Sequence, residues 1–163
     1  MVDATGQVLI PGLCDAVIPH GTTMMFTDPH EIANVLGLRG VRMMHDEALL
    51  QRVNIFTQMP SCAPAAPGME TTGFEIGPDD VAEAMTWPGI IGLGEMMNYP
   101  GVINGSQQML EEIAATMRAG KVVGGHYAAS APCALDWLRI APMPAETTAA
   151  LSMIFCSRPM MPE

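Results

Sequence analysis

The chain has 163 residues, of which 49% are hydrophobic, and it carries a formal net charge of −10 with a pI near 4.6. This length and apolar content suit one domain with a sizeable core. Only seven Lys and Arg residues occur, and they are scattered. A surface that binds phosphate backbones needs clustered basic residues, so we expect no nucleic-acid partner.

The N-terminal segment and the cysteines bear on the location of the protein. Asp3 lies where a secretory signal would have a basic segment followed by an apolar one. No apolar run approaches the roughly 18 residues of a membrane-spanning helix, so we expect no membrane partner. The four cysteines form no C-x-x-C pair, and we interpret them as reduced thiols of a cytoplasmic protein; they are Cys14, Cys62, Cys133 and Cys156.

The first part of the chain predicts apolar strands with helices between them. Asp28 can cap a helix that has Pro29 at its first position, and Gly37 ends the apolar face of that helix. Short β-branched and apolar runs predict the strands. The predicted strands are residues 8–10, continued through 13–16, then 22–27 and 53–59, with a turn at 19–21 and a second helix at about 38–50.

The second part continues the alternation after a loop rich in Pro and Gly at residues 63–77. A helix is predicted over residues 78–85, with two aspartates in its first turn, where the helix dipole favours acids. An amphipathic helix at 106–119 then separates strands at 90–96 and 121–126. From Cys133 onward prolines recur without a clear period, and we expect poor order there.

Strands that alternate with helices predict an α/β fold with a parallel sheet, and the apolar later strands indicate burial on both faces of that sheet. A closed (β/α)8 barrel of the TIM type needs about 200–250 residues. This chain supplies only four to five parallel strands. The sequence therefore predicts either an open sheet or part of a barrel.

Three of the apolar strands lead into side chains that can bind a metal. Asp28 and His30 follow the strand at 22–27, Glu95 follows the run at 90–94, and His126 ends the last strand. Parallel strands gather such residues at their carboxyl ends, and consecutive strands are usually neighbours. A carboxylate after so apolar a run is costly to desolvate unless it is paired or metal-bound. Histidine is the commonest metal ligand.

Other interpretations of these residues stay open. Asp28 is a suitable N-cap, and His30 can be an exposed residue of the first helical turn. Glu95 can be a solvated acid just past its strand, and His126 a hydrogen-bonded structural residue. Ser61 and Cys62 follow the third strand and would face the same pocket, but no base lies beside them in the sequence, which disfavours a nucleophile. No G-x-G-x-x-G, P-loop or H-E-x-x-H motif is present.

Several motifs resemble those of the amidohydrolase superfamily, and in particular of its adenine deaminases. The segment at 8–16 resembles the lead-in to the first barrel strand of that superfamily. The deaminase-like motifs follow in the family's order, and the resemblance covers about residues 7–130. These motifs are residues 19–23, 28–37, 59–65, 92–102 and 120–128.

The resemblance implies a distorted (β/α)8 barrel with a small β domain. It also implies a divalent metal, manganese, iron or zinc, that activates water for attack on C6 of adenine, so that hypoxanthine and ammonia form. By the same resemblance Glu95 and His126 are metal ligands. The resemblance also implies that Glu95 is a catalytic residue, together with His30 and Asp28, which line the opening of the same metal site.

The chain departs from the family pattern in two places. The His-x-His ligand pair expected after Asp15 and Ala16 is missing, and residues 17–21 already match the start of the second strand. The resemblance also ends near Ser130. We therefore divide the chain into residues 1–16, a remnant of the lead-in to the first strand, residues 17–130, a partial barrel, and residues 131–163, a divergent tail.

Two remaining ligands make a poor metal site, because catalytic zinc sites usually keep three protein ligands. We therefore expect a truncated enzyme that binds metal weakly and is inactive alone. Uncovered sheet edges also predict association between copies of the chain. The alternatives are a non-catalytic remnant or association module, and an amidohydrolase that acts on another cyclic amidine or amide. The run at 28–35 argues against the last.

Overall fold

The structure, a computed structural model, describes residues 11–125. The expected strand at 8–10, the candidate ligand His126 and the tail at 131–163 lie outside these residues. The described elements are a 3-10 helix η1 (Pro11–His20), strands β1 (Met24–Thr27), β2 (Asn54–Met59), β3 (Ile90–Met96) and β4 (Val122–Gly125), and helices α1 (His30–Leu36), α2 (Leu38–Ala48), α3 (Pro78–Ala84), α4 (Tyr99–Ile103) and α5 (Gln107–Arg118).

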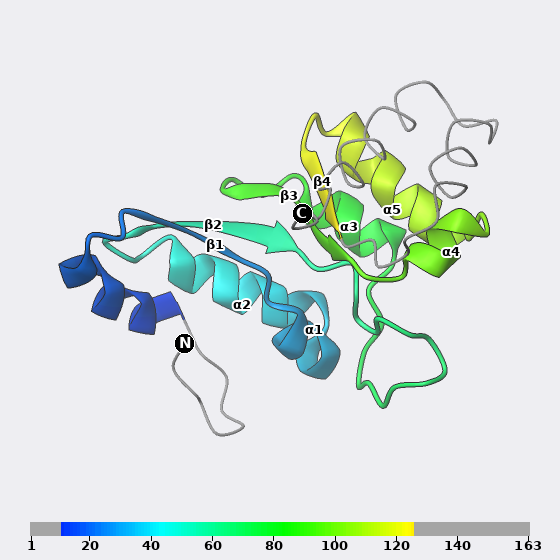
Figure 1. Cartoon of the computed structure of the whole chain (residues 1–163), viewed down its shortest axis with the longest axis horizontal. Helices are drawn as coiled ribbons and strands as arrows, with labels where there is room; N and C mark the ends of the chain where they lie inside the picture. The colour runs from blue at the N-terminus through cyan, green and yellow to red at the C-terminus, as the bar shows by residue number, and fades with distance from the viewer. Residues whose placement is uncertain (1–10, 126–163) are drawn as a thin grey trace, which may run out of the picture.

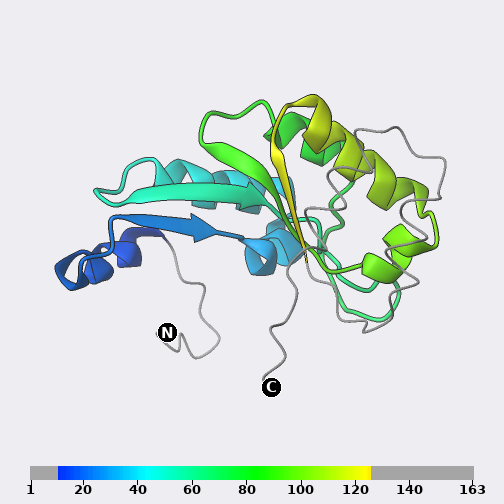
Figure 2. The ribbon, with the colours of Figure 1, turned by 45° about the horizontal axis from the view of Figure 1, so that its top comes forward.

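All four strands belong to one parallel sheet in the order β1-β2-β3-β4, so each strand lies beside the next one in the chain. In Figure 2 the strands run alongside one another and converge near the start of α1. Figure 1 shows the helices that connect them. The predicted α/β class, with four parallel strands alternating with helices as in part of a barrel, is confirmed.

Two local predictions are wrong. Residues 13–16 belong to the helix η1 and do not extend a strand; Pro11 has the fixed φ that suits the start of a helix. The short helix α4 was not expected. The Asn98 side chain begins it by accepting a hydrogen bond from the Gly101 N–H at 3.0 Å. The expected turn at 19–21 is confirmed only at Gly21, which adopts a φ of +87°, because residues 19 and 20 belong to η1.

The two faces of the sheet differ. The helices cover one face, on which residues from β2, β3 and β4 share register positions and form part of the core; they are Ile55, Met59, Ile90, Leu93 and Val123. On the other face Met24 is 49% exposed and Phe26 60% exposed, and the Phe26 ring stacks on Phe56. The expectation of burial on both faces is therefore wrong for β1.

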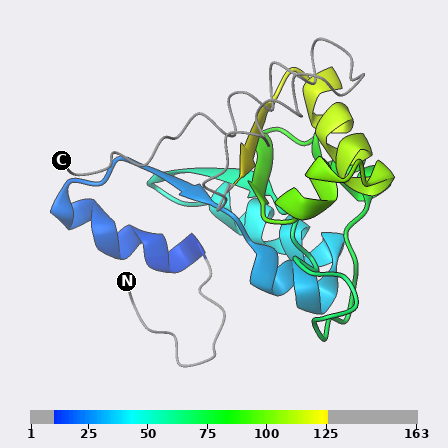
Figure 3. The same cartoon turned by 45° about the vertical axis from the view of Figure 1, so that its right-hand side comes forward.

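A long loop between β2 and α3 is attached to helix α1. The Gly73 N–H donates to the Asn34 carbonyl at 2.9 Å, and the Thr72 hydroxyl lies 3.0 Å from the Asn34 side-chain oxygen. Figures 1 and 3 show this loop beside α1. Phe74 packs against Gly37, which has a φ of +61° between α1 and α2. The loop thus fixes the position of α1 at the carboxyl edge of the sheet.

Among the described residues, the helices are all too short or too polar to span a lipid bilayer.

Candidate metal centre at the carboxyl edge of the sheet

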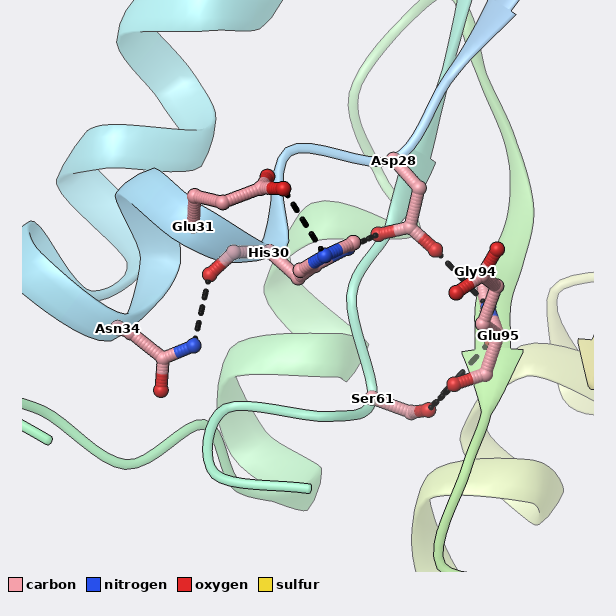
Figure 4. A network of polar contacts seen from close by, with 7 residues as sticks. All are labelled: Asp28, His30, Glu31, Asn34, Ser61, Gly94 and Glu95. Carbon is pink, nitrogen blue, oxygen red and sulfur yellow. Dashed lines mark hydrogen bonds and ion pairs between the residues drawn. The ribbon is translucent and has the colours of Figure 1, made fainter. Parts of the chain in front are cut away.

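The Asp28 carboxylate connects two strands that are not neighbours. Asp28 directly follows β1, and its Oδ2 accepts a hydrogen bond from the Glu95 backbone N–H of β3 at 2.9 Å (Figure 4). Gly94 makes this contact possible, because a Cβ at that position would collide with the Asp28 carboxylate. Because Gly94 has no side chain, the largely buried Asp28 carboxylate can reach the backbone of β3.

The alternative role of Asp28 as a helix cap is wrong. Pro29 is the N-cap residue of α1, and no side chain forms a capping hydrogen bond there. An N-cap carboxylate would accept from an N–H of the first helical turn. Asp28 instead accepts from Glu95, 67 residues away, so its side chain serves the carboxyl edge of the sheet.

His30 is the first residue of α1 and lies between two carboxylates. Its Nδ1 is 3.5 Å from Asp28 Oδ1, and its Nε2 is 3.2 Å from Glu31 Oε1. The Asn34 side chain donates to the His30 backbone carbonyl at 3.0 Å (Figure 4). The Asp28 side chain is 11% exposed, whereas that of Glu31 is 74% exposed. His30 thus separates a buried acid from a solvated one.

Glu95 lies inside β3 and is half-buried, so it is not a solvated acid in a loop past the strand. One ligand atom each from Asp28, His30 and Glu95 lie within 4.8 Å of one another. The structure thus brings together the three residues that the sequence analysis named as catalytic candidates. His126, which was predicted as a metal ligand, lies outside the described residues.

Burial raises the pKa of Asp28, and the negative charge of Glu95 adds to this effect. The hydrogen bond from the Glu95 N–H and the nearby His30 act in the opposite direction without reversing it. Asp28 Oδ1 and His30 Nδ1 are buried and form no hydrogen bond within the described part of the chain. The Asp28 carboxylate and the His30 imidazole, together with the nearby Glu95 carboxylate, fit a divalent cation, which would favour the ionised carboxylates.

Ser61 and Cys62 also reach this edge. The Ser61 hydroxyl donates to the Glu95 carbonyl at 2.9 Å. Burial raises the pKa of the Cys62 thiol to about 12, and the charges of Asp28 and Glu95 contribute. A thiol that stays protonated at neutral pH is a poor nucleophile, which agrees with the sequence analysis. The position of Ser61 just after β2 predicted that it faces this site, but not its hydrogen bond to the Glu95 carbonyl.

The two remaining described histidines take no part in this cluster. His20 is exposed at the end of η1. His45 is 1% exposed on α2, and its ring centroid lies 5.8 Å from that of Trp87. His20 is thus solvated and His45 is part of the core.

The fold and the cluster define the protein as a partial α/β barrel that gathers acidic and imidazole groups at the carboxyl edge of its strands. The chain is 73% identical over 143 residues to adenine deaminase 1 of Jannaschia sp. (strain CCS1) and 71% identical over 145 residues to the adenine deaminase of Ruegeria pomeroyi. It is 49% identical over 145 residues to the adenine deaminase of Moorella thermoacetica. No protein-family model matches the chain.

The chain is similar to one part of these adenine deaminases. The matches cover 77–78% of this chain but only 24% of each of these relatives. The alignment with the Jannaschia relative is 143 positions long, whereas 77% of this 163-residue chain is only about 126 residues. The Jannaschia relative therefore carries residues inside the matched stretch that this chain lacks.

Proposed function

We propose that this chain carries part of the metal site of an adenine deaminase-type hydrolase, which converts adenine and water to hypoxanthine and ammonia. The observation that supports this most directly is the cluster of Asp28, His30 and Glu95 within 4.8 Å at the carboxyl edge of the sheet. The names of the relatives supply the reaction. The proposal places the protein in purine metabolism and in the cytoplasm.

In this proposal Glu95 and His126 are the principal metal ligands, and Asp28 and His30 complete the site. When bound, a divalent metal lowers the pKa of a coordinated water toward neutrality. Carboxylate-rich donor sets suit manganese, while the imidazole also admits iron or zinc, and we propose manganese first. Asp28 orients Glu95 through its hydrogen bond to the Glu95 N–H. His30 lies beside the other carboxylate oxygen of Asp28, Oδ1, and offers Nδ1 or Nε2 as a ligand.

We propose further that the isolated chain binds manganese weakly and does not deaminate adenine. The His-x-His pair that the family supplies from its first strand has no counterpart after Ala16. The described residues offer three candidate ligands, of which Asp28 is already committed through Oδ2 to a backbone N–H. A site with fewer free donors holds its ion less tightly.

The test combines Mn²⁺ titration calorimetry with ammonia release from adenine. We expect the purified chain to bind one Mn²⁺ with an affinity that Glu95→Gln lowers at least about tenfold, and to release no ammonia. A second version carries the missing segment of the Jannaschia relative inserted after Ala16. If only this version releases ammonia, the result would support an adenine deaminase-type enzyme that is inactive because it lacks this segment. Unchanged Mn²⁺ binding in Glu95→Gln would refute the metal site.

The exposed face of β1 favours a second candidate function, that of an association module. Met24 and Phe26 are 49% and 60% exposed on one face of an edge strand. Exposed apolar side chains on a strand edge promote pairing with another chain. If self-association is the function, Phe26→Ser should convert oligomers to monomers in light scattering, whereas Met69→Ser, in an exposed loop, should leave the mass unchanged.

A further inference from the structure

The backbone around Glu95 lies where the regular pairing of the sheet is interrupted. The β2–β3 register runs to the pair Met59 and Leu93, and the β3–β4 register shifts between Leu93 and Met96. Glu95 falls inside this irregular stretch. Parallel ladders hold strand peptides at regular intervals, so side-chain contacts add most to the orientation of a peptide where the register shifts.

Two side chains from neighbouring strand ends supply those contacts. Asp28 accepts from the Glu95 N–H at 2.9 Å, and the Ser61 hydroxyl donates to the Glu95 carbonyl at 2.9 Å (Figure 4). Ser61 Oγ also lies 3.4 Å from the Gly94 carbonyl oxygen. Ser61 is only 4% exposed, so water competes little for its hydroxyl. Side-chain hydrogen bonds therefore hold both peptide groups that flank the Glu95 Cα.

We propose that Ser61 is a positioning residue for the Glu95 carboxylate. Its hydroxyl fixes the carbonyl of Glu95 and, with Asp28, sets the direction in which the Glu95 side chain leaves β3. Ser61 itself touches neither metal nor substrate in this role. The inference rests on the proposed metal site. Hydrogen bonds that orient metal ligands typically change metal affinity by about 10- to 100-fold when they are removed.

The test compares Ser61→Ala with Thr116→Val in the full 163-residue chain. The Thr116 hydroxyl also donates to a backbone carbonyl, that of Glu112 at 3.0 Å, and Thr116 is fully buried in α5 away from the cluster. Both substitutions remove one buried hydroxyl. Titration calorimetry reports the Mn²⁺ affinity, the visible absorption of bound Co²⁺ reports the ligand geometry, and denaturation in EDTA reports the stability without metal.

We expect Ser61→Ala to weaken Mn²⁺ binding about 10- to 100-fold and to change the Co²⁺ spectrum. Thr116→Val should keep both properties while losing a comparable amount of stability in EDTA. Mn²⁺ binding by Ser61→Ala as tight as that of the wild type, with an unchanged Co²⁺ spectrum, would overturn the role of Ser61 and leave the metal site intact. A wild-type chain that binds no Mn²⁺ would overturn the metal site and this role together.

Discussion

Asp28 and Glu95, 67 residues apart, are joined by a 2.9 Å hydrogen bond from the Glu95 N–H to Asp28 Oδ2, across the end of the intervening strand β2. The contact brings two acids from different strands to one edge of the sheet. This hydrogen bond lowers the pKa of Asp28 and so opposes the larger effect of burial, which raises that pKa.

Gly94→Ala tests the space that this contact requires. The added Cβ would collide with the Asp28 carboxylate, so we expect a loss of about 1–3 kcal/mol in the free energy of unfolding. Mn²⁺ affinity should also fall. Urea denaturation in EDTA measures the first effect and calorimetry the second. The control is Gly77→Ala, where an added Cβ meets no atom within 4 Å. Equal stability of the two variants would contradict the close approach.

His30→Gln tests the imidazole of the cluster. His30 lies against Asp28 at 3.5 Å and Glu31 at 3.2 Å, and we expect its replacement to lower Mn²⁺ affinity by about tenfold. His20→Gln is the matched control, because His20 is exposed at the end of η1. Calorimetry of both variants decides the question. If His30→Gln and His20→Gln bind Mn²⁺ equally well, His30 is not a ligand.

Glu112 should make the protein less stable as the pH rises. Burial raises the pKa of Glu112 from 4.5 to about 8, against a smaller opposing effect of its hydrogen bond from Gln108. Between these two values the folded state keeps the proton and the unfolded state releases it, so the free energy of unfolding falls as the pH rises from about 4.5 to 8. The total loss is on the order of a few kcal/mol.

Glu112→Gln should remove this pH dependence and be more stable than the wild type at pH 8. Urea denaturation between pH 5 and pH 8 measures the effect. Glu111→Gln is the control, since Glu111 is an exposed neighbour on the same helix. A parallel fall in stability for the wild type and Glu112→Gln would show that Glu112 does not cause it.

His45 should make the protein less stable in acid. Burial lowers the pKa of His45 below 6.5, its ordinary value, and Arg42 contributes against the opposing charge of Asp46. The folded state therefore disfavours the protonated ring, and stability is lost as the pH falls through 6.5. His45→Phe keeps a ring against Trp87 and should not show this acid-dependent loss of stability. Thermal unfolding at pH 5 and pH 7.5 measures it, and an unchanged acid loss in His45→Phe would contradict the prediction.

Local sequence patterns determined most of the secondary structure. The run at 54–59 alternates buried and more exposed residues, and the run at 90–96 is mostly apolar, as strands require. Pro78 with two following aspartates begins a helix by its fixed φ and by the helix dipole. The order of strands followed from the alternation of strands and helices. Residues 13–16 were misjudged, because a short apolar run fits a strand and a 3-10 helix equally well.

The sequence by itself determined the parallel α/β architecture and named Asp28, His30 and Glu95 as residues that follow apolar strands. Only the tertiary structure decided how they meet. Whether Asp28 caps its helix or bonds to Glu95 depends on the absence of a side chain at Gly94. The Ser61 contact to Glu95 likewise spans 34 residues. Such contacts arise from the twist and register of neighbouring strands, which no local pattern encodes.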